Sequence, residues 1–473
     1  MQGKPVSRRQ ALRAMVVGAG VLSLSSVVAA CGSVAAPGAV SGGPLKGTVE
    51  FMGHFTPEGT NDVRDDASKA VWDEFKQQQP NITVKWQQTA WQTIGEKYMA
   101  AWSAGSAPDV SLFSPANIAQ TVLLGALEDL KPHLNKWPQA EKDDYPKVWW
   151  DVGDYGGKKY IAPLLLFGGL PIYRKSMFEQ AGQKIENIKT WDDWVKAQQA
   201  VVVDGQGRHP TDPNFDAGSV KTWGFAAFMA RGSGATIPFY SSMMVYLTGK
   251  QEVEPPDWQA DRWTSPESIN AVERATNWIK KDKIQPQSTL NMNLSDADKF
   301  FANGMCAAYS FGTNTYPTAR KNMQFDPLDA VFGQTPTTDG KKSGPLFVNH
   351  WSMGVSSKSK NKEAAFAVVD GWLTKQADLH FAKIAGQQPK RASSASDPFF
   401  DQPDHSYVKT FAEAQKQWAV PILSAPVRTD EILLEAYHSI VAQNRPVKDA
   451  MQDAQAKYTK LLGGISKDKL PKG

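Results

Sequence analysis

Apolar positions near the start of the chain switch between two spacings, which predicts strands that alternate with helices. Some segments are short apolar runs or carry apolar residues at every second position, as strands do, while others carry them at helical spacing until Pro80, Gly105 or Gly125. The predicted strands and helices follow one another in the order 48–52, 63–79, 82–86, 91–104, 110–113 and 115–124. Because strands separated by helices pair in parallel, this pattern predicts an α/β fold with helices on both faces of a sheet.

The predicted topology places a ligand site at one edge of the sheet. In α/β sheets, ligands sit beyond the carboxyl ends of the strands. Those ends are Gly53–Phe55, the segment before Trp91, and Ser114–Asn117. We therefore expect these three segments to form part of a binding site.

The rest of the chain is less regular. Residues 364–373 and 431–441 have the pattern of amphipathic helices. Segments 204–220 and 251–261 are rich in Gly, Pro and Asp, which predicts loops. The sequence contains no internal repeat.

Composition indicates an ordinary globular protein with two or three domains. The chain has 473 residues, of which 41% are hydrophobic and 21% are charged. Four Lys and Arg residues within positions 1–30 account for the whole formal net charge of +4. The remainder is neutral, so net charge gives no support to nucleic-acid binding.

Tryptophan is unusually frequent, with 16 residues. Aromatic side chains often pack in cores, but they also line sites for flat apolar faces such as those of sugar rings. For some of these tryptophans packing is the better explanation. They are Trp149, Trp150, Trp191, Trp194 and Trp278.

The first 30 residues have the pattern of an export signal. A twin arginine at Arg8–Arg9 precedes an apolar stretch, residues 14–30, which ends in small residues. The twin arginine resembles a Tat signal, although Ala11 stands where a bulky residue is usual, and a Sec signal remains the alternative.

Cys31 follows Val28-Ala29-Ala30, as in a bacterial lipobox. This pattern predicts a lipidated mature N-terminus at Cys31 and a flexible tether over 31–47, with residues 48–473 anchored outside the cytoplasm. The alternative is an uncleaved signal anchor. If Cys31 is lipidated, Cys306 has no second cysteine to pair with, and it is expected to be a small buried hydrophobic residue.

Familiar catalytic motifs are missing from the sequence. No His pair four residues apart, no Cys-x-x-Cys and no Gly-x-Ser-x-Gly occurs, so we expect no bound metal, no cofactor and no catalytic residues. The segment 212–223 lacks the glycine and the glutamate of a calcium loop. A glycoside hydrolase remains an alternative, because its two catalytic carboxylates can be far apart in the sequence.

A series of short motifs resembles a known family in order and spacing. The motifs lie at 105–110, 125–130, 157–163, 172–175, 178–182, 189–193, 301–308 and 358–365. In this order, behind a lipobox, they resemble the family 1 extracellular solute-binding proteins of bacterial ABC importers, the sugar-type group that includes maltose-binding protein. The resemblance covers nearly all of residues 48–390 and weakens after Arg391.

The resemblance implies a periplasmic-binding-protein-like fold of type II. Two lobes, each a mainly parallel sheet flanked by helices, would be joined by hinge crossovers and would trap solute between them. By this similarity, one lobe comprises 48–165 and 312–354, and the other comprises 168–310 and 357–473. Crossovers would fall at Leu166–Gly168, Ser310–Phe311 and Val355–Ser356, with hinge residues at Phe167, Gly168, Ser310 and Val355.

The strand ends and the resemblance together indicate a set of solute-contacting residues. Aromatic faces and neutral or cationic planar groups suit a sugar-type solute. The set comprises His54, Phe55, Trp91, Phe113, Ser114, Asn117, Arg231, Thr236, Tyr240, Phe311, Asn314, Asn349, His350, Trp351, Gln388 and Arg391.

Each of these residue types also has a purely structural interpretation. Trp91 lies on the periodic face of its helix, Phe113 ends a buried strand, and Asn117 suits a helix cap. Trp351 and His350 can pack beneath the site. Arginines at 231 and 391 can pair with acids or remain solvated.

The predicted function is therefore capture of a neutral, carbohydrate-like solute, such as a mono- or oligosaccharide, by hinge closure. The partners are an ABC importer permease and the membrane through the lipid anchor, and the chain is expected to be a monomer that binds no nucleic acid. A polyol, a glycerol phosphate ester, a surface glycoside hydrolase and a sensor that docks a receptor are the alternatives. Two cleft-facing arginines, Arg231 and Arg391, would favour the phosphate ester.

Overall fold

The computed structural model describes residues 45–60, 62–231, 263–312, 315–344, 346–417, 419–421 and 429–463. The predicted export signal, Cys31 and most of the tether lie outside these ranges. Within the ranges, no helix is both long enough and apolar enough to cross a bilayer.

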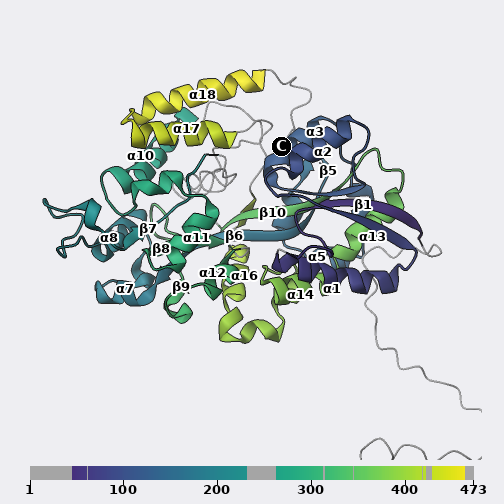
Figure 1. Ribbon diagram of the computed structural model, residues 1–473, viewed down its shortest axis with the longest axis horizontal. Coiled ribbons are helices and arrows are strands. Elements are labelled where there is room, and N and C mark those ends of the chain that lie inside the picture. The colour runs from purple at the N-terminus through teal and green to yellow at the C-terminus, as the bar shows by residue number, and fades with distance from the viewer. Residues whose placement is uncertain are drawn as a thin grey trace, which may run out of the picture. The chain divides into compact units, whose positions relative to one another are not determined.

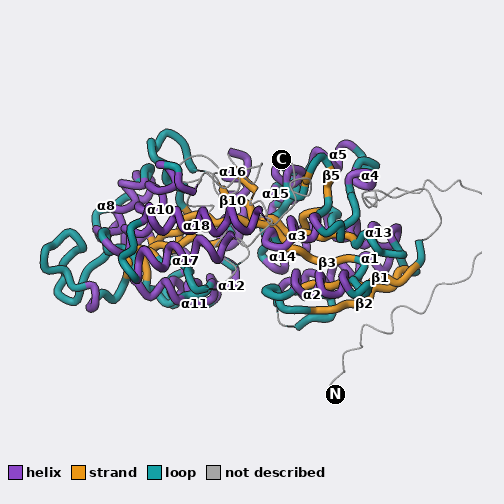
Figure 2. The backbone as a smooth tube through the Cα atoms, turned by 90° about the horizontal axis from the view of Figure 1, so that it is seen from above, coloured by secondary structure: helices purple, strands orange, loops and turns teal. Residues whose placement is uncertain are grey.

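The first sheet has the parallel order that the alternating pattern predicts. Strand β1 (Gly47–Gly53) pairs in parallel with β2 (Ile82–Gln88) on one side and with β3 (Val110–Phe113) on the other. On the far side of β3 lies β10 (Leu346–Val355), which is antiparallel, followed by the first half of β6 (Ala162–Arg174). Because the three strands are parallel, the carboxyl ends of β1, β2 and β3 lie at the same edge of the sheet. Figure 2 shows these three strands in the same part of the fold.

Helices pack on this sheet through aromatic side chains. Helix α1 (Val63–Gln78) begins at a capping box in which the Asp62 side chain accepts from a backbone N–H of the first turn. Trp372 is buried in a cluster with Phe75 and Trp86. The helices of this region are α1, α2 (Ile94–Ser103), α3 (Pro115–Leu123), α4 (Lys131–Leu134), α5 (Gln139–Asp143), α6 (Lys147–Asp151), α13 (Lys362–Trp372), α14 (Lys375–Ala385) and α15 (Ala392–Ala395). A short hairpin of β4 (Asp154–Tyr155) and β5 (Lys158–Lys159) accompanies them.

The second half of β6 belongs to another sheet. It pairs antiparallel with β8 (Cys306–Gly312) and β9 (Ala330–Phe332), and β7 (Trp223–Phe225) is parallel to β8. A separate buried aromatic cluster contains Trp194 and Trp278. The helices around this sheet are α7 (Lys175–Gln180), α8 (Trp191–Val201), α10 (Pro266–Lys280), α11 (Leu294–Ala302), α12 (Tyr316–Lys321), α17 (Thr429–Ala442) and α18 (Val447–Gly463), and Figure 1 shows α17 and α18 beside α10.

Short elements complete the described chain. Helix α16 (Tyr407–Gln417) packs on β11 (Ala419–Pro421), which pairs in parallel with the start of β10. The short 3-10 helices of the described ranges are Ile185–Asn187, Ala217–Ser219, Gln287–Asn291, Pro327–Asp329, Pro398–Asp401 and Pro403–His405.

One strand passes from the first sheet to the second. In β6, Gly168 pairs with Val348 of β10, whereas the next residue, Gly169, pairs with Gly312 of β8. The partner change falls directly after Phe167 and Gly168, where the resemblance places a hinge. β6 and β10 run side by side up to this point (Figure 1).

The predicted lobe boundaries need correction in the second half of the chain. Residues 330–337, assigned to the first lobe, pair with the second-sheet half of β6 and with Thr190 at the start of α8. Residues 362–385, assigned to the second lobe, form α13 and α14, which pack on β1, β10 and α1. The first lobe therefore includes α13 and α14, and α17 and α18 belong to the second lobe.

The other two predicted hinge residues each pair within a single sheet. Ser310 pairs with Pro171 inside the second sheet, and Val355 pairs with Val110 inside the first sheet. The sequence after Val355 resembles a crossover because a polar turn and a helix start follow it. In the structure that helix packs back on the same sheet.

Candidate functional site

The loops that follow β1 and β2 are joined at the predicted edge. The backbone N–H of Thr89, directly after β2, donates to the carbonyl of Gly53 at the end of β1 (2.9 Å). The Gln88 side-chain amide donates to the His54 carbonyl (3.2 Å). Trp91, two residues after Thr89, leaves 36% of its surface exposed. Trp91 thus offers an accessible aromatic side chain on the loop that adjoins the His54 backbone.

The start of α3 brings Ser114 and Asn117 together. The Asn117 amide donates to the Ser114 hydroxyl (3.3 Å), and both residues are half-buried. Gly95, at the start of α2, makes room for Asn117, because a Cβ at this position would lie only 2.1 Å from the Asn117 Cγ. The sequence analysis did not identify Gly95. Its signal was a glycine within the first turn of a helix.

His54 lies against Trp351 with 4.0 Å between the ring centroids. Among the described residues, neither nitrogen of the buried His54 ring has a hydrogen-bond partner. Burial, with a smaller effect of the Arg64 charge, holds the pKa of His54 well below its usual value of 6.5. The imidazole is therefore neutral near pH 7, with one nitrogen able to donate and the other able to accept.

The residues preceding Trp351 on β10 lie next to the point where β6 changes sheets. Asn349 is half-buried opposite Phe167, and its side-chain oxygen accepts from the His350 N–H (2.8 Å). The His350 ring is buried and pairs with the Ser352 hydroxyl (2.7 Å). Asn349 is thus available at the edge, whereas His350 is a structural histidine.

Acid is expected to destabilise the protein through His350. Burial, together with the nearby Lys159, lowers the pKa of His350 to about 3 in the folded state, whereas an unfolded histidine titrates near 6.5. The neutral ring thus contributes stability that is fully present above about pH 6.5 and is lost as the pH falls towards 3. Between pH 6.5 and 5, this histidine should lower the free energy of unfolding by about 1.4 kcal/mol per pH unit.

Denaturant titrations at several pH values measure this dependence. The variant His350→Gln should show a smaller slope with pH. The variant Ser352→Ala loses the partner of the ring but leaves the ring buried, so it should keep the slope at a lower stability. An unchanged slope in His350→Gln would contradict the assignment.

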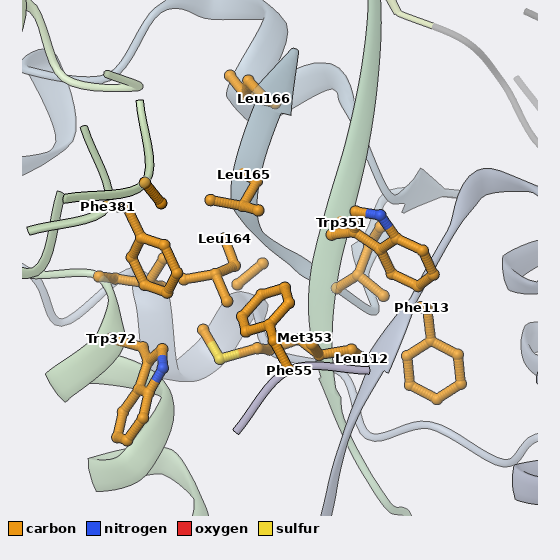
Figure 3. Close-up of a cluster of buried hydrophobic side chains, with 14 of the residues drawn as sticks. Phe55, Leu112, Phe113, Leu164, Leu165, Leu166, Trp351, Met353, Trp372 and Phe381 are labelled. Carbon is orange, nitrogen blue, oxygen red and sulfur yellow. The ribbon is translucent and has the colours of Figure 1, made fainter. Parts of the chain in front are cut away.

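Phe55 and Phe113 are not available to a solute. Both rings are fully buried, Phe55 against Phe381 and Phe113 against Tyr98. Figure 3 shows them within the apolar cluster on which the first sheet packs. Apolar residues at strand ends can face either the core or a ligand, and here the rings of Phe55 and Phe113 both face the core.

Arg391 is not a solute-facing arginine either. Its side chain is only 2% exposed and forms ion pairs with Glu141 (2.7 Å) and Asp144 (3.1 Å). It also donates two hydrogen bonds to the Leu373 carbonyl. Both its charge and its donors are occupied within the first lobe.

Gln388 is buried close to Arg391 but has different surroundings. Among the described residues, neither its side-chain nitrogen nor its side-chain oxygen has a hydrogen-bond partner. A buried amide of this kind is a group that a polar ligand can satisfy.

The remaining predicted site residues are only partly described. Arg231 is exposed, and only the backbone of Phe311 is described, opposite Leu170. Thr236, Tyr240 and Asn314 lie outside the described residues.

In the described ranges, no group of three or more His, Cys, Asp or Glu side chains is placed to hold a metal ion. Cys306 is buried in β8, and burial raises the pKa of its thiol. The predicted site residues that the structure leaves at or beside the sheet edge are thus aromatic rings and neutral polar groups, with Trp351 buried against His54. They are His54, Trp91, Ser114, Asn117, Asn349 and Trp351.

Comparison with known proteins identifies relatives along most of the chain. A family model described as "Bacterial extracellular solute-binding protein" matches residues 61–378. A binding protein of Brucella abortus is 22% identical over 391 residues, which cover 82% of this chain and 88% of that protein.

Solved structures share the fold at low sequence identity. An ABC substrate-binding protein from Listeria monocytogenes in complex with cycloalternan has a TM-score of 0.72 and 19% identity, covering 88% of this chain and 99% of that one. A solute-binding protein from Agrobacterium radiobacter K84 in complex with ribitol has a TM-score of 0.70 and 19% identity, covering 88% and 100%. Both are proteins of ABC transporters.

Proposed function

Because the chain belongs to the bacterial extracellular solute-binding proteins, we propose that it captures a neutral, carbohydrate-like solute and delivers it to the permease of an ABC importer. The family acts outside the cytoplasm by binding rather than by catalysis. Capture would occur between the two lobes, and the permease would recognise the closed form.

The chemistry of the sheet edge carries this proposal. Trp91 supplies an exposed aromatic ring for the C–H face of a sugar, with the buried Trp351 packed behind His54, and neutral His54 and Asn117 supply paired donors and acceptors for hydroxyl groups. A neutral imidazole accepts and donates without favouring an anion. Neighbours in the comparison bind an oligosaccharide and a polyol, which agrees with this chemistry.

A polyol is the second candidate, since the ribitol-bound neighbour has a TM-score close to that of the cycloalternan-bound one. The phosphate ester loses support, because Arg391 is committed to Glu141 and Asp144. A surface glycoside hydrolase has support from neither the family nor the neighbours.

Closure would take place where β6 changes sheets. The consecutive glycines Gly168 and Gly169 have no Cβ, so their backbone can change φ and ψ at little cost. The start of β10 pairs with β11 at Leu346–Val348, and the end of β8 reaches the same point through Gly312. We propose β6, β10 and β11, together with the end of β8, as the hinge.

The export signal and Cys31 complete the proposal. A lipid-anchored monomer on the outer face of the cell membrane would present the solute to its permease. Metabolic labelling with a palmitate analogue tests the anchor, since Cys31→Ala should abolish the label and release the protein.

A thermal-shift screen of residues 47–473 tests the function. The panel contains mono-, di- and oligosaccharides, polyols and glycerol phosphates. A solute at 100 times its Kd should add about 2.7 kcal/mol to the free energy of unfolding, which raises Tm measurably. A stabilising solute that is recovered chemically unchanged supports a binding protein, and a response to glycerol phosphates alone would contradict a neutral solute.

Replacing Trp91 with alanine is expected to weaken solute binding about tenfold, which corresponds to about 1.4 kcal/mol. Because the ring is partly exposed, Tm without solute should barely change. Trp102→Ala is the matched control, since Trp102 lies on α2 with Lys358 over its ring (4.0 Å). Isothermal titration of both variants with the stabilising solute measures the effect, and equal affinities would remove Trp91 from the site.

A further inference from the structure

The segment that follows α14 is held rigidly on the first lobe. Helix α14 ends at Gly386, whose φ of +66° is the left-handed conformation that favours glycine. The Gly386 carbonyl accepts from the Tyr407 hydroxyl (3.0 Å), and the Gln387 N–H donates to the Phe381 carbonyl (3.1 Å). The turn out of the helix is thus fixed on both sides.

Asp378 on α14 fixes the next two residues. Its buried carboxylate accepts from the backbone N–H and from the ammonium group of Lys390 (3.1 and 3.0 Å). The backbone N–H of Arg391 donates to the other oxygen (3.1 Å). A carboxylate with this many donors orients the main chain at both positions.

Asp144, directly after α5, fixes the residues beyond. It pairs with the Arg391 guanidinium and accepts from the backbone N–H and the hydroxyl of Ser393 (2.8 and 2.7 Å). The N–H of Ala392 donates to the Asp144 carbonyl (2.9 Å). The segment 386–393 is therefore tied to α14 and α5 together.

Gln388 stands at the centre of this fixed segment without a partner for its amide. Its neighbour Gln387 donates its amide N–H to the Ala385 carbonyl (3.0 Å) and leaves only its side-chain oxygen unpartnered, whereas among the described residues the Gln388 amide makes no hydrogen bond at either atom. Both side chains are buried. An unsatisfied buried amide costs stability, which a protein retains where the group serves a ligand.

The end of α14 lies near the candidate site. Phe381, in the last turns of α14, contacts Phe55 (5.6 Å between centroids), and Phe55 follows His54 in the chain. Figure 3 shows the Phe381 and Phe55 rings in the same cluster. Gln388 comes seven residues after Phe381, on the segment that Asp378 and Asp144 hold on the first lobe.

We propose that Gln388 is a preorganised solute-binding amide, with Asp378, Lys390 and Arg391 acting as positioning residues that hold it in place before solute arrives. The amide donates and accepts at once, so it selects a solute with two adjacent hydroxyl groups, or a hydroxyl group beside an ether oxygen. This inference rests on the proposed solute-binding function and adds a residue-level account of selectivity to it.

The thermal stability of the solute-free protein tests the unpartnered amide. Gln388→Met should raise Tm by about 1–3 °C, because it removes a buried polar group that has lost its water without gaining a partner. Gln387→Met is the matched control and should lower Tm, because it breaks the bond to Ala385. An unchanged or lower Tm in Gln388→Met would show a structural amide and overturn the proposal.

Hydrogen exchange on the solute-free full chain tests the positioning network. The backbone amides of Lys390 and Arg391 should be strongly protected without solute and change little when the solute found in the screen is added. Fast exchange at both amides without solute would overturn preorganisation. Lys390→Met should speed exchange at these amides, and Lys390→Arg should restore the protection.

The outcomes separate this inference from the proposed function. If no sugar or polyol stabilises the wild-type chain while Gln388→Met still raises Tm and the amides remain protected, the solute class is wrong and the preorganised amide stands. If a solute binds and Gln388→Met leaves its affinity unchanged, the function stands and the role of Gln388 is refuted.

Discussion

Replacing Arg391 with alanine is expected to lower the free energy of unfolding by about 3–5 kcal/mol, the range for breaking a buried ion pair. The guanidinium pairs with Glu141 and Asp144, donates to the Leu373 carbonyl, and lies over the Tyr145 ring (4.5 Å). Its loss would leave carboxylates and a buried carbonyl without their donor. Denaturant unfolding at neutral pH measures the change.

A surface ion pair provides the control for this experiment. Lys383, on α14, pairs with Asp397, but both side chains are partly exposed to water. Lys383→Ala should therefore cost less than about 1 kcal/mol. If Arg391→Ala left stability unchanged while it weakened solute binding, Arg391 would return to the binding site.

Replacing Trp372 with alanine is expected to cost about 3–5 kcal/mol, as for other large aromatic side chains truncated in a core. The indole is 1% exposed and contacts Phe51, Trp72 and Trp86 (6.2, 6.3 and 5.5 Å between centroids). β1, α1 and β2, which all lie far from Trp372 in the sequence, would lose a packing partner that they share. Calorimetry or denaturant unfolding measures the loss.

The location of the damage tests the corrected lobe boundaries. Hydrogen exchange in Trp372→Ala should accelerate first in β1 and α1, because α13 belongs to their core. Trp278→Ala is the matched variant in the other aromatic cluster, and its effect should concentrate in β7 and α8. If Trp372→Ala instead accelerated exchange around β7 and α8, α13 would belong with the second lobe, as the motifs implied.

The first lobe was largely predictable because its signals are local. Alternating and helical spacing placed the elements from β1 to α3 in the right order, and parallel pairing put His54, Trp91 and Ser114 at one edge. The family resemblance implied a second lobe and a crossover at Leu166–Gly168, next to which β6 changes its partner strand. Each of these inferences needed only residues within a few turns of one another, or a motif of known order.

The errors came from contacts between distant parts of the chain. Arg391 reaches Glu141 and Asp144 across about 250 positions of sequence, and no local pattern reveals such a pair. Phe113 and Trp351 both suited a stacking role by residue type, but packing buries both rings, Phe113 against Tyr98 and Trp351 against His54. The lobe predicted for α13 was wrong for the same reason. A polar turn after Val355 has the same sequence pattern whether the chain crosses to the other lobe or folds back on the same one.

The order in which the lobes can be completed differs from the order of the chain. The core of the first lobe needs α13 and α14, and the second needs α17 and α18, which pack on α10 far upstream. A nascent chain that has emerged as far as β8 therefore contains most strands of both sheets, but it lacks helices that complete the hydrophobic core of each lobe. Domains usually fold as they are synthesised, yet the apolar faces of both lobes stay incomplete here until nearly the last described helix has left the ribosome.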